Sequence, residues 1–324
     1  MPKQCSFVGT TNKRCPGTAE NDDLCHWHDP NETKNRPRDR RDLEAWAKSR
    51  KPMEGFSLRY ADLENIDLVN KDSDEGFNLT NADLNHANLR GAHLYNIDLK
   101  GSALLKADFR HANLNFADMR DTDILGADMT KARIEHTKWG DKVRQENLAE
   151  IAVKQNQHEE ALDYYQQAEE TYRALCTVCE AEGQFEEAGQ FYYREMIARR
   201  HQLPLLSSKR LPSKMVDFMC AYGESPARVI GISIVLILFC AVFYFFLGID
   251  NEGLAIVFRP DKDLTENVLA LGNCIYFSVV TFTTLGYGDI TPIGLARFIA
   301  TIEAFSGTFI LALFVVVFAK KMMR

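Results

Sequence analysis

The sequence of 324 residues predicts a multidomain membrane protein, in which a large hydrophilic head precedes an all-α membrane domain. Three observations predict this class. The apolar runs Val229–Leu247 and Ile293–Ala319 hold 19 and 27 residues, and about 20 residues of helix cross a hydrocarbon core. A five-residue repeat of apolar positions fills residues 56–139. Nearly all charged residues precede the first apolar run, so the mean hydropathy near zero averages two unlike parts.

Composition excludes several other classes. The formal net charge of -7 argues against a protein that binds nucleic acid by neutralising phosphates. Eight cysteines are too few for a disulfide framework in a chain of this length. Chain order then predicts six parts, which are a Cys/His motif at 1–35, a basic linker at 36–54, the repeat at 55–141, a helical hairpin connector at 142–202, an interfacial linker at 203–227 and the membrane domain at 228–324.

The first part contains a candidate metal site. Cys5, Cys15, Cys25 and His28 follow the spacing C-x9-C-x9-C-x2-H in a segment without an apolar core. Three thiolates and one imidazole are a complete ligand set for tetrahedral structural Zn²⁺, and the pattern resembles small bacterial Cys3His zinc motifs. His26 is the rival fourth ligand. The alternative is a tail with free thiols that continues into the basic linker.

The repeat places a large apolar residue at every fifth position and a small one two residues earlier. Neither the helical period of 3.6 nor the strand period of 2 fits this spacing. The units Ala82–His86 and Ala107–His111 follow A-(D/N)-L-x-x, so the stretch resembles the pentapeptide-repeat family. The resemblance implies a right-handed quadrilateral β-helix with four repeats per coil. Lys71–Gly76 breaks the phase and should bulge from a corner.

Many repeats carry Asp between the two apolar positions. The resulting acidic stripe is either a solvated face that keeps the repeat soluble or a docking face for a basic partner. The head is expected to meet an unknown cytosolic ligand or protein.

Glu159–Arg200 has apolar residues at spacings of three and four, interrupted at Gly183, which predicts an antiparallel helical hairpin. Cys176 and Cys179 form a C-x-x-C pair inside its first helix, which indicates either two packed thiols or, more weakly, metal or redox chemistry. The segment Leu203–Pro226 should hold a short helix at the inner membrane surface.

Between the two apolar runs lies an apolar half-span, followed by Thr284–Asp289, which reads Thr-Leu-Gly-Tyr-Gly-Asp. The half-span is too short to cross the membrane and return, so it predicts a re-entrant pore helix surrounded by protein. The region 228–324 resembles the pore domain of two-transmembrane tetrameric potassium channels. Its expected parts are an outer helix at about 228–248, a pore helix and filter at about 268–289, and an inner helix at about 292–319.

The resemblance implies a homotetramer in a lipid bilayer, with K⁺ in the pore. The backbone carbonyls of Thr284, Leu285, Gly286 and Tyr287 and the Thr284 hydroxyl would line the ion sites, with Gly288 completing the filter. Leu285 stands where Val is commoner. Asp289 and Thr283 would support the filter.

The inner helix contains further candidates. Glu303 would either brace the pore helix behind the filter or face the conduction path. Gly307 would either bend the helix or allow close packing. Phe309, Phe314 and Phe318 could narrow the pore as an apolar gate.

The predicted function is passive K⁺ conduction, gated or assembled through the head, with no catalytic step. A non-selective cation channel and a tetrameric anchor that presents an interaction scaffold remain the alternatives. Basic residues flank both apolar runs, whereas the loop between them is acidic. This distribution predicts a multi-pass protein of the cell inner (plasma) membrane with both termini cytoplasmic.

Overall fold

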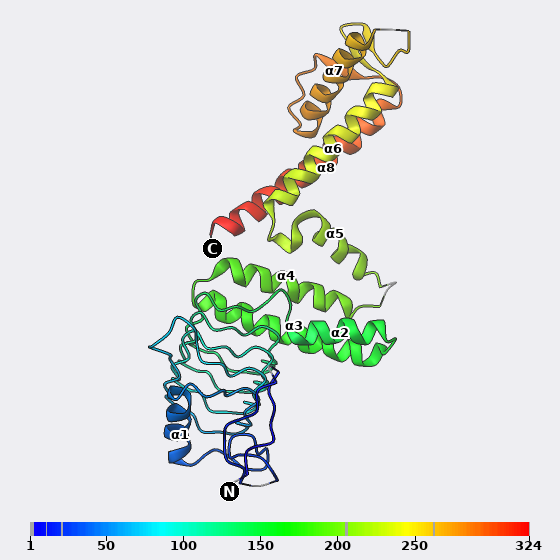
Figure 1. Cartoon of the computed structure of the whole chain (residues 1–324). Helices are drawn as coiled ribbons and strands as arrows, with labels where there is room; N and C mark the ends of the chain where they lie inside the picture. The colour runs from blue at the N-terminus through cyan, green and yellow to red at the C-terminus, as the bar shows by residue number, and fades with distance from the viewer. Residues whose placement is uncertain (1–2, 11, 21, 205–206, 262, 324) are drawn as a thin grey trace. The chain divides into compact units, whose positions relative to one another are not determined.

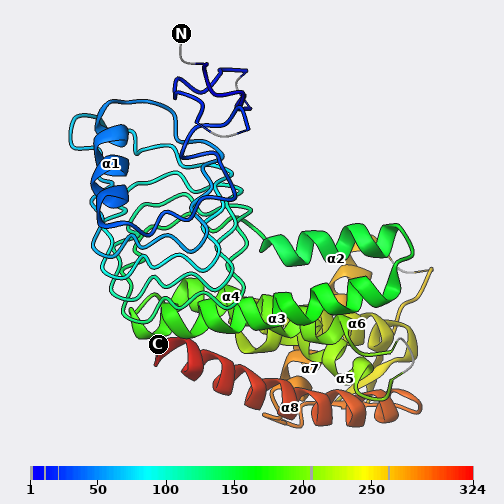
Figure 2. The same cartoon turned by 90° about the horizontal axis from the view of Figure 1, so that it is seen from below.

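The computed structural model describes residues 3–10, 12–20, 22–204, 207–261 and 263–323. The chain divides into two compact units, Met1–Leu205 and Leu206–Arg324. The first unit has one hydrophobic core, and the second has two hydrophobic clusters. Figure 1 and Figure 2 show the coils and helices of the first unit in blue to green and the helices of the second in yellow-green to red.

The repeat forms a stack of coils. Parallel backbone bridges join Asn78 to Asp98, Asp98 to Asp118, and Asp118 to Lys138. Each step spans 20 residues (98 − 78, 118 − 98, 138 − 118), so one coil holds four five-residue repeats. The paired apolar positions of the repeat are buried, as at Leu84 and Ala107. Stacking therefore builds one continuous core from units that could not bury their apolar faces alone.

The first coil is longer than the others. Ser57 pairs with Asp83, a step of 26 residues (83 − 57), and the six residues Lys71–Gly76 account for the difference. Gly76 closes this insertion against the next coil, because a Cβ there would lie 1.5 Å from the carbonyl oxygen of Asn96.

The corners of the coils turn through left-handed backbone. The last residue of a repeat has positive φ, for example 57° at Tyr60, 55° at Asn81 and 60° at His111. Glycine occupies only some corners. The other corners are residues with side chains, for which the left-handed conformation is energetically unfavourable. This conformation is needed there because it turns the chain every five residues.

Residues 36–54 differ from the expected basic linker. They contain helix α1 (Pro37–Lys48), in which Leu43 and Ala47 are buried in the core of the first unit. Arg40 Nη1 donates to the carbonyl oxygen of Glu64 at 2.6 Å. Because most residues of the segment are charged, its narrow apolar face is hard to recognise in the sequence. This face packs the segment into the folded head.

The N-terminal segment also covers the open edge of the first coil. Three backbone N–H groups of that coil find their acceptors there, in the pairs Ser57 to the Trp27 carbonyl at 2.8 Å, Asp62 to the Lys34 carbonyl at 3.2 Å, and Asp67 to the Glu44 carboxylate at 3.0 Å. An uncovered edge would present these groups to other chains.

Three helices follow the coils: α2 (Arg144–Lys154), α3 (His158–Ala181) and α4 (Phe185–His201). α3 and α4 correspond to the expected hairpin, with Gly183 at φ 74° in the turn between them. α2 is an additional helix that packs on α3. The buried Tyr172 hydroxyl of α3 bonds to the Glu146 carboxylate of α2 and accepts from the Val143 N–H, which fastens α3 to the start of α2.

The second unit is helical. It contains α5 (Arg210–Cys220), the 3₁₀ turn η1 (Ala221–Gly223), α6 (Pro226–Leu247), α7 (Leu264–Phe282) and α8 (Ala296–Met322). α6 and α8 are long and apolar enough to cross a membrane. They pack against each other, and α7 packs on both.

A small antiparallel sheet with the strand order β2-β1-β3 lies in the second unit. Its strands are β1 (Ile249–Asn251), β2 (Leu254–Ile256) and β3 (Ile290–Pro292). Residue Ile249 pairs with Pro292, so the segment after the candidate filter is tied to the end of α6. No periodicity in the sequence predicts these short strands.

Candidate functional site

The candidate filter follows α7, which ends at Phe282. The N–H of Thr284 donates to the Thr281 carbonyl at 3.1 Å, and that of Leu285 donates to the Val280 carbonyl at 3.0 Å. These bonds fix the start of the loop to the end of α7.

The filter backbone alternates between two conformations. Thr284, Gly286 and Gly288 have φ of 57°, 60° and 80°, whereas Leu285 and Tyr287 are not in the left-handed region. The glycines take up this conformation without strain. A Cβ at either glycine would meet no atom within 4 Å in the single chain. The alternation rotates successive peptide groups, so their carbonyls can face one side.

Two predicted support residues lie at the ends of the filter. The Thr283 hydroxyl donates to the Val279 carbonyl at 2.7 Å and thereby caps the C-terminal end of α7. The Asp289 carboxylate pairs with the Tyr276 hydroxyl on α7. Both side chains therefore contact the helix that precedes the filter.

Glu303 lies in a buried hydrogen-bond network that joins three helices. Its carboxylate accepts a hydrogen bond from Tyr244 of α6 at 2.5 Å and another from Ser278 of α7. Glu303, Tyr244 and Ser278 are all buried. Sequence reasoning singled out Glu303 but not its two partners, because a lone Tyr or Ser in an apolar helix has no spacing signature.

Gly307 lies where α8 crosses the end of α7. A Cβ at this position would stand 2.1 Å from the carbonyl oxygen of Phe282. α8 runs as one helix from Ala296 to Met322. In this conformation, Gly307 provides close packing without a break in the helix.

The candidate gate residues lie in the C-terminal half of α8. Phe314 and Phe318 stack with ring centroids 5.6 Å apart. Phe314 also packs against the cluster that contains Cys220 and Val229. Phe309 pairs instead with Phe305 and is exposed in the single chain.

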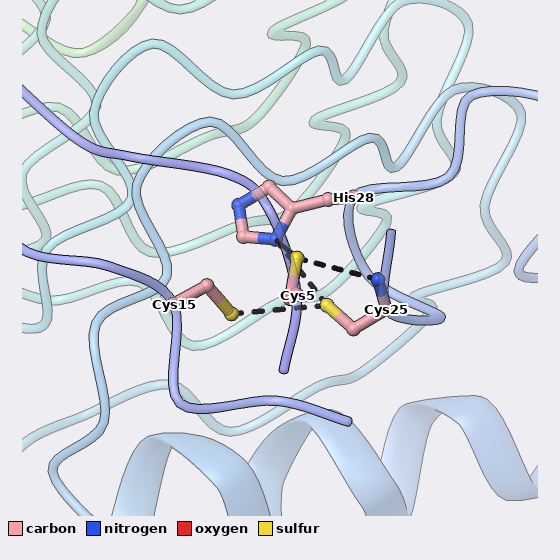
Figure 3. Close-up of side chains that lie close together, drawn as sticks. All are labelled: Cys5, Cys15, Cys25 and His28. Carbon is pink, nitrogen blue, oxygen red and sulfur yellow. Dashed lines mark hydrogen bonds between the residues drawn. The ribbon is translucent and has the colours of Figure 1, made fainter. Parts of the chain in front are cut away.

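The N-terminal segment brings the four predicted metal ligands together (Figure 3). Cys5, Cys15, Cys25 and His28 are buried, and their ligand atoms lie within 4.8 Å of one another. The Cys15 and Cys25 sulfurs are 3.8 Å apart, and His28 Nδ1 lies 3.7 and 3.3 Å from the Cys5 and Cys25 sulfurs. A tetrahedron with Zn–S bonds of about 2.3 Å has edges of about 3.8 Å. The donor set and its dimensions therefore fit Zn²⁺.

The surroundings of the four ligands also fit a metal. The backbone N–H of Gly17 points at the Cys15 sulfur, with N and S 3.4 Å apart, and the N–H of Cys25 points at the Cys5 sulfur at 3.3 Å. His28 Nε2 lies 3.0 Å from the Glu54 carbonyl, so this nitrogen can donate while Nδ1 faces the sulfurs. Metal-bound histidines are oriented in this way.

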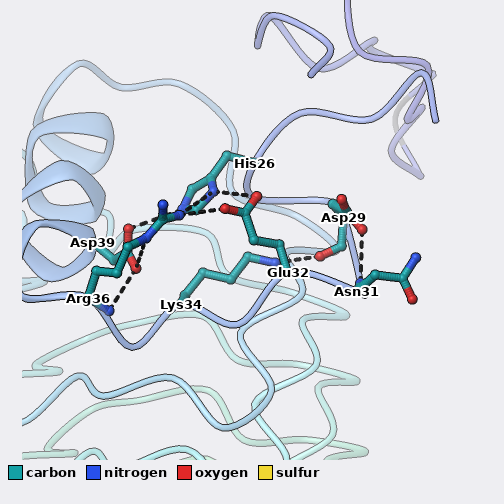
Figure 4. Close-up of polar contacts among 7 residues, drawn as sticks. All are labelled: His26, Asp29, Asn31, Glu32, Lys34, Arg36 and Asp39. Atoms are coloured by element: carbon teal, nitrogen blue, oxygen red, sulfur yellow. Dashed lines mark hydrogen bonds and ion pairs between the residues drawn. The ribbon is translucent and has the colours of Figure 1, made fainter. Parts of the chain in front are cut away.

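His26, the rival ligand, lies in a different cluster (Figure 4). Its Nδ1 is 2.9 Å from the Glu32 carboxylate and its Nε2 is 3.3 Å from that of Asp39. Lys34 is fully buried beside this cluster and donates to the Asp29 carbonyl, and burial lowers the pKa of its ammonium group. These polar contacts hold the segment between the cysteine cluster and α1.

Cys176 and Cys179 are both buried in α3. In the part of the chain that the structure describes, neither belongs to a group of three or more metal-ligating side chains. Burial raises the pKa of the Cys179 thiol to about 12, which favours a packed, protonated thiol over a reactive one.

Comparison with known proteins identifies two parts of the chain. Residues 231–324 match the family described as ion channel. Residues 78–115 and 104–138 match pentapeptide repeats, in eight copies. Protein LctB of Bacillus caldotenax is 35% identical over 69 residues, which are 21% of this chain and 49% of LctB. The chain thus spans about half the length of that curated relative.

Solved structures similar to this chain are pentapeptide repeat proteins. Rfr23 from the cyanobacterium Cyanothece 51142 is 25% identical, with 26% of this chain and 52% of that chain covered and a TM-score of 0.23. A protein from Nostoc PCC 7120 is 18% identical, with 33% and 88% covered and a TM-score of 0.18. From the two family matches, the chain carries an ion channel domain at its C-terminal end and pentapeptide repeats ahead of it.

Proposed function

We propose that four copies of this chain form a potassium-selective channel that conducts K⁺ passively, with no catalytic step. The observation that carries the proposal is the alternating backbone of Thr284–Gly288, which follows α7 between the two candidate membrane helices. Four such loops around an axis make rings of carbonyl oxygens that replace the hydration shell of the ion. The carbonyls of residues 284–287 and the Thr284 hydroxyl are the proposed ligands.

The exposed side chains of the single chain support the homotetramer. Leu285 and Tyr287 of the filter are 58% and 68% exposed, and Phe298 and Phe305 of α8 are exposed as well. Large apolar side chains beside a filter loop need partners, because one loop cannot enclose an ion. Four-fold assembly supplies them from identical neighbours.

Asp289, Thr283 and Glu303 are proposed to support the filter through α7. The contacts of Asp289 and Thr283 with α7, and the bonds of Glu303 to Tyr244 and Ser278, support these roles. Phe314 and Phe318 are the proposed inner gate, and Gly307 is the packing contact of α8 with the end of α7.

The remaining parts of the proposal concern the head and the membrane. The head is a right-handed quadrilateral β-helix, an assignment supported by its 20-residue coils. It holds a structural Zn²⁺ at Cys5, Cys15, Cys25 and His28, supported by the dimensions of that cluster. The channel lies in the cell inner membrane with both termini cytoplasmic, where the head meets a soluble ligand or protein that gates or assembles the pore.

The deciding experiment is a reversal-potential measurement. The purified full chain is reconstituted in a planar bilayer with K⁺ on one side and Na⁺ on the other. A value near the K⁺ equilibrium potential is expected. A reversal potential near zero with current flowing would instead establish a non-selective cation channel.

A glycine pair controls this measurement. Gly286→Ala should abolish selective K⁺ current, because φ of 60° is strained for alanine. Gly272→Ala, in α7, should leave selectivity unchanged, because its Cβ would meet no atom within 4 Å. In cells, a phenotype that depends on the chain should be lost with Gly286→Ala, and a phenotype that persists in this variant would mean that the membrane part acts as an anchor.

A further inference from the structure

A groove of about 600 Å³ runs between α5 and α6. Phe218 of α5 forms one wall, and Val235, Leu236 and Phe239 of α6 form the other. Gly231 opens the groove at the level of the second turn of α6, where a Cβ would meet no atom within 4 Å. Phe218 is 72% exposed, so the apolar lining faces the surroundings of the chain rather than a packed core.

One end of the groove is cationic. Arg228 is the charged residue of its lining, and its Nη1 donates to the Asp217 carbonyl at 3.2 Å and lies 3.5 Å from the Asp217 carboxylate. These contacts hold α5 against the start of α6. The guanidinium carries five N–H donors in all, and the side chain is about half exposed, so it can also reach an anionic group at the mouth of the groove.

The surrounding sequence adds positive charge. Lys209, Arg210 and Lys214 lie on or directly before α5, against the single acidic residue Asp217. Leu211 and Met215 of α5 are exposed beside these charges. Basic and apolar side chains on one short helix are typical of a segment that lies at a membrane surface and attracts anionic lipid.

We propose that the α5–α6 groove binds one anionic phospholipid, with an acyl chain along Gly231 and Val235 and the phosphate beside Arg228. The apolar lining matches the chain, and the cationic mouth matches the headgroup. The inference rests on the proposed placement of α6 in the membrane. α5, which lies between the head and α6 in the chain, would then respond to the charge of nearby lipids.

Fluorescence quenching by brominated lipid tests the proposal without measuring current. The three tryptophans of the chain, Trp27, Trp46 and Trp139, all lie in the head, so Phe239→Trp adds a probe in the groove wall. The full-length variant is placed in vesicles that contain phosphatidylcholine and phosphatidylglycerol, with bromine on the acyl chains of one lipid or the other. Phe246→Trp, near the outer end of α6, is the matched control.

The groove probe should report an enrichment of brominated phosphatidylglycerol of about fivefold over the bulk composition, the effect expected for one basic residue near an anionic lipid. Arg228→Gln should remove this enrichment, so that the groove probe reports about the bulk composition. Gly231→Phe should fill the groove and remove quenching at the probe. The control probe should follow the bulk composition throughout.

Two results would overturn the proposal. One is equal quenching by both lipids at the groove probe, unchanged by Arg228→Gln. The other is a groove probe that no lipid quenches, together with loss of the assembled oligomer in Gly231→Phe, which would show that a second copy of the chain fills the groove. Neither result bears on K⁺ selectivity, which the reversal potential measures separately.

Discussion

The carbonyl oxygen of Phe282 lies directly against Gly307, so close that a Cβ on residue 307 would stand 2.1 Å from it. Phe282 ends α7, and the filter begins two residues later. α8 and the base of the proposed filter therefore share one backbone contact that only glycine permits.

Gly307→Ala should separate α8 from α7 and disturb the filter. Overpacking of this kind costs about 1–3 kcal/mol, so we expect a lower melting temperature of the assembled protein and reduced K⁺ current. Gly272→Ala is the control, because its added Cβ meets open space. If Gly307→Ala had wild-type stability and current, α8 would be able to shift and accommodate a side chain at residue 307.

The Glu303 network predicts a contrast between two substitutions. Glu303→Ala leaves the buried Tyr244 hydroxyl without its acceptor, which should cost about 2 kcal/mol, whereas the Ser278 hydroxyl keeps the Ile237 carbonyl at 2.8 Å as an acceptor. Glu303→Gln keeps one acceptor oxygen and should lose less. Thermal unfolding of the purified oligomer measures both. A change in single-channel conductance without any change in stability would place the carboxylate in the conduction path.

The metal site predicts one Zn²⁺ per chain. His28→Ala and Cys25→Ser should each abolish stoichiometric zinc, as measured by elemental analysis of the purified full chain. His26→Ala should retain it, because His26 contacts Glu32 and Asp39 instead of the cysteines. If His26→Ala lost zinc and His28→Ala retained it, His26 would be the fourth ligand instead of His28.

Much of this architecture could be predicted from the sequence, since each large part has its own period. The five-residue spacing predicted the coils, and two apolar runs with a glycine-alternating loop predicted the membrane domain. Helix α1 was not predicted, because Leu43 and Ala47 form only a narrow apolar face among many charged residues. Contacts between distant residues, such as Tyr244 with Glu303 or Gly307 with Phe282, depend on how helices cross, and no local pattern records that.

The coils carry a pH-dependent ion pair. Arg120 lies beside Asp118, at 2.5 Å between Nη2 and Oδ2, and lowers the pKa of that carboxyl. A depressed folded-state pKa adds stability above the ordinary carboxyl pKa, and this stability is lost as the pH falls through the lower folded value. Asp118→Asn should therefore cost at most about 1 kcal/mol near neutrality, because Arg120 is half exposed.

Unfolding of the head followed from pH 7 to pH 2 checks this. The difference between Asp118→Asn and the wild type should shrink in acid, while Asp121→Asn on the next corner should differ little at any pH. A gap that persists at pH 2 would mean that the substitution acts through packing.

The C-terminal end of α8 is tied to the turn before α6. Lys320 Nζ lies 2.6 Å from the Glu224 carboxylate. Glu224→Lys and Lys320→Glu should each break this tie and lower the melting temperature by a similar amount, and the double exchange should restore most of the loss. Failure of the exchange to restore stability would show that the two side chains contribute separately.

The N-terminal cover of the first coil has a consequence for cells that run short of zinc. Three edge N–H groups of that coil depend on Trp27, Lys34 and Glu44, and two of these lie within six residues of the proposed ligand His28. A head without metal would release this cover and present a ready template for strand addition. In the proposed tetramer, uncovered heads would then join neighbouring assemblies. Metal starvation would be seen as clustering of the protein in the membrane before any loss of conduction.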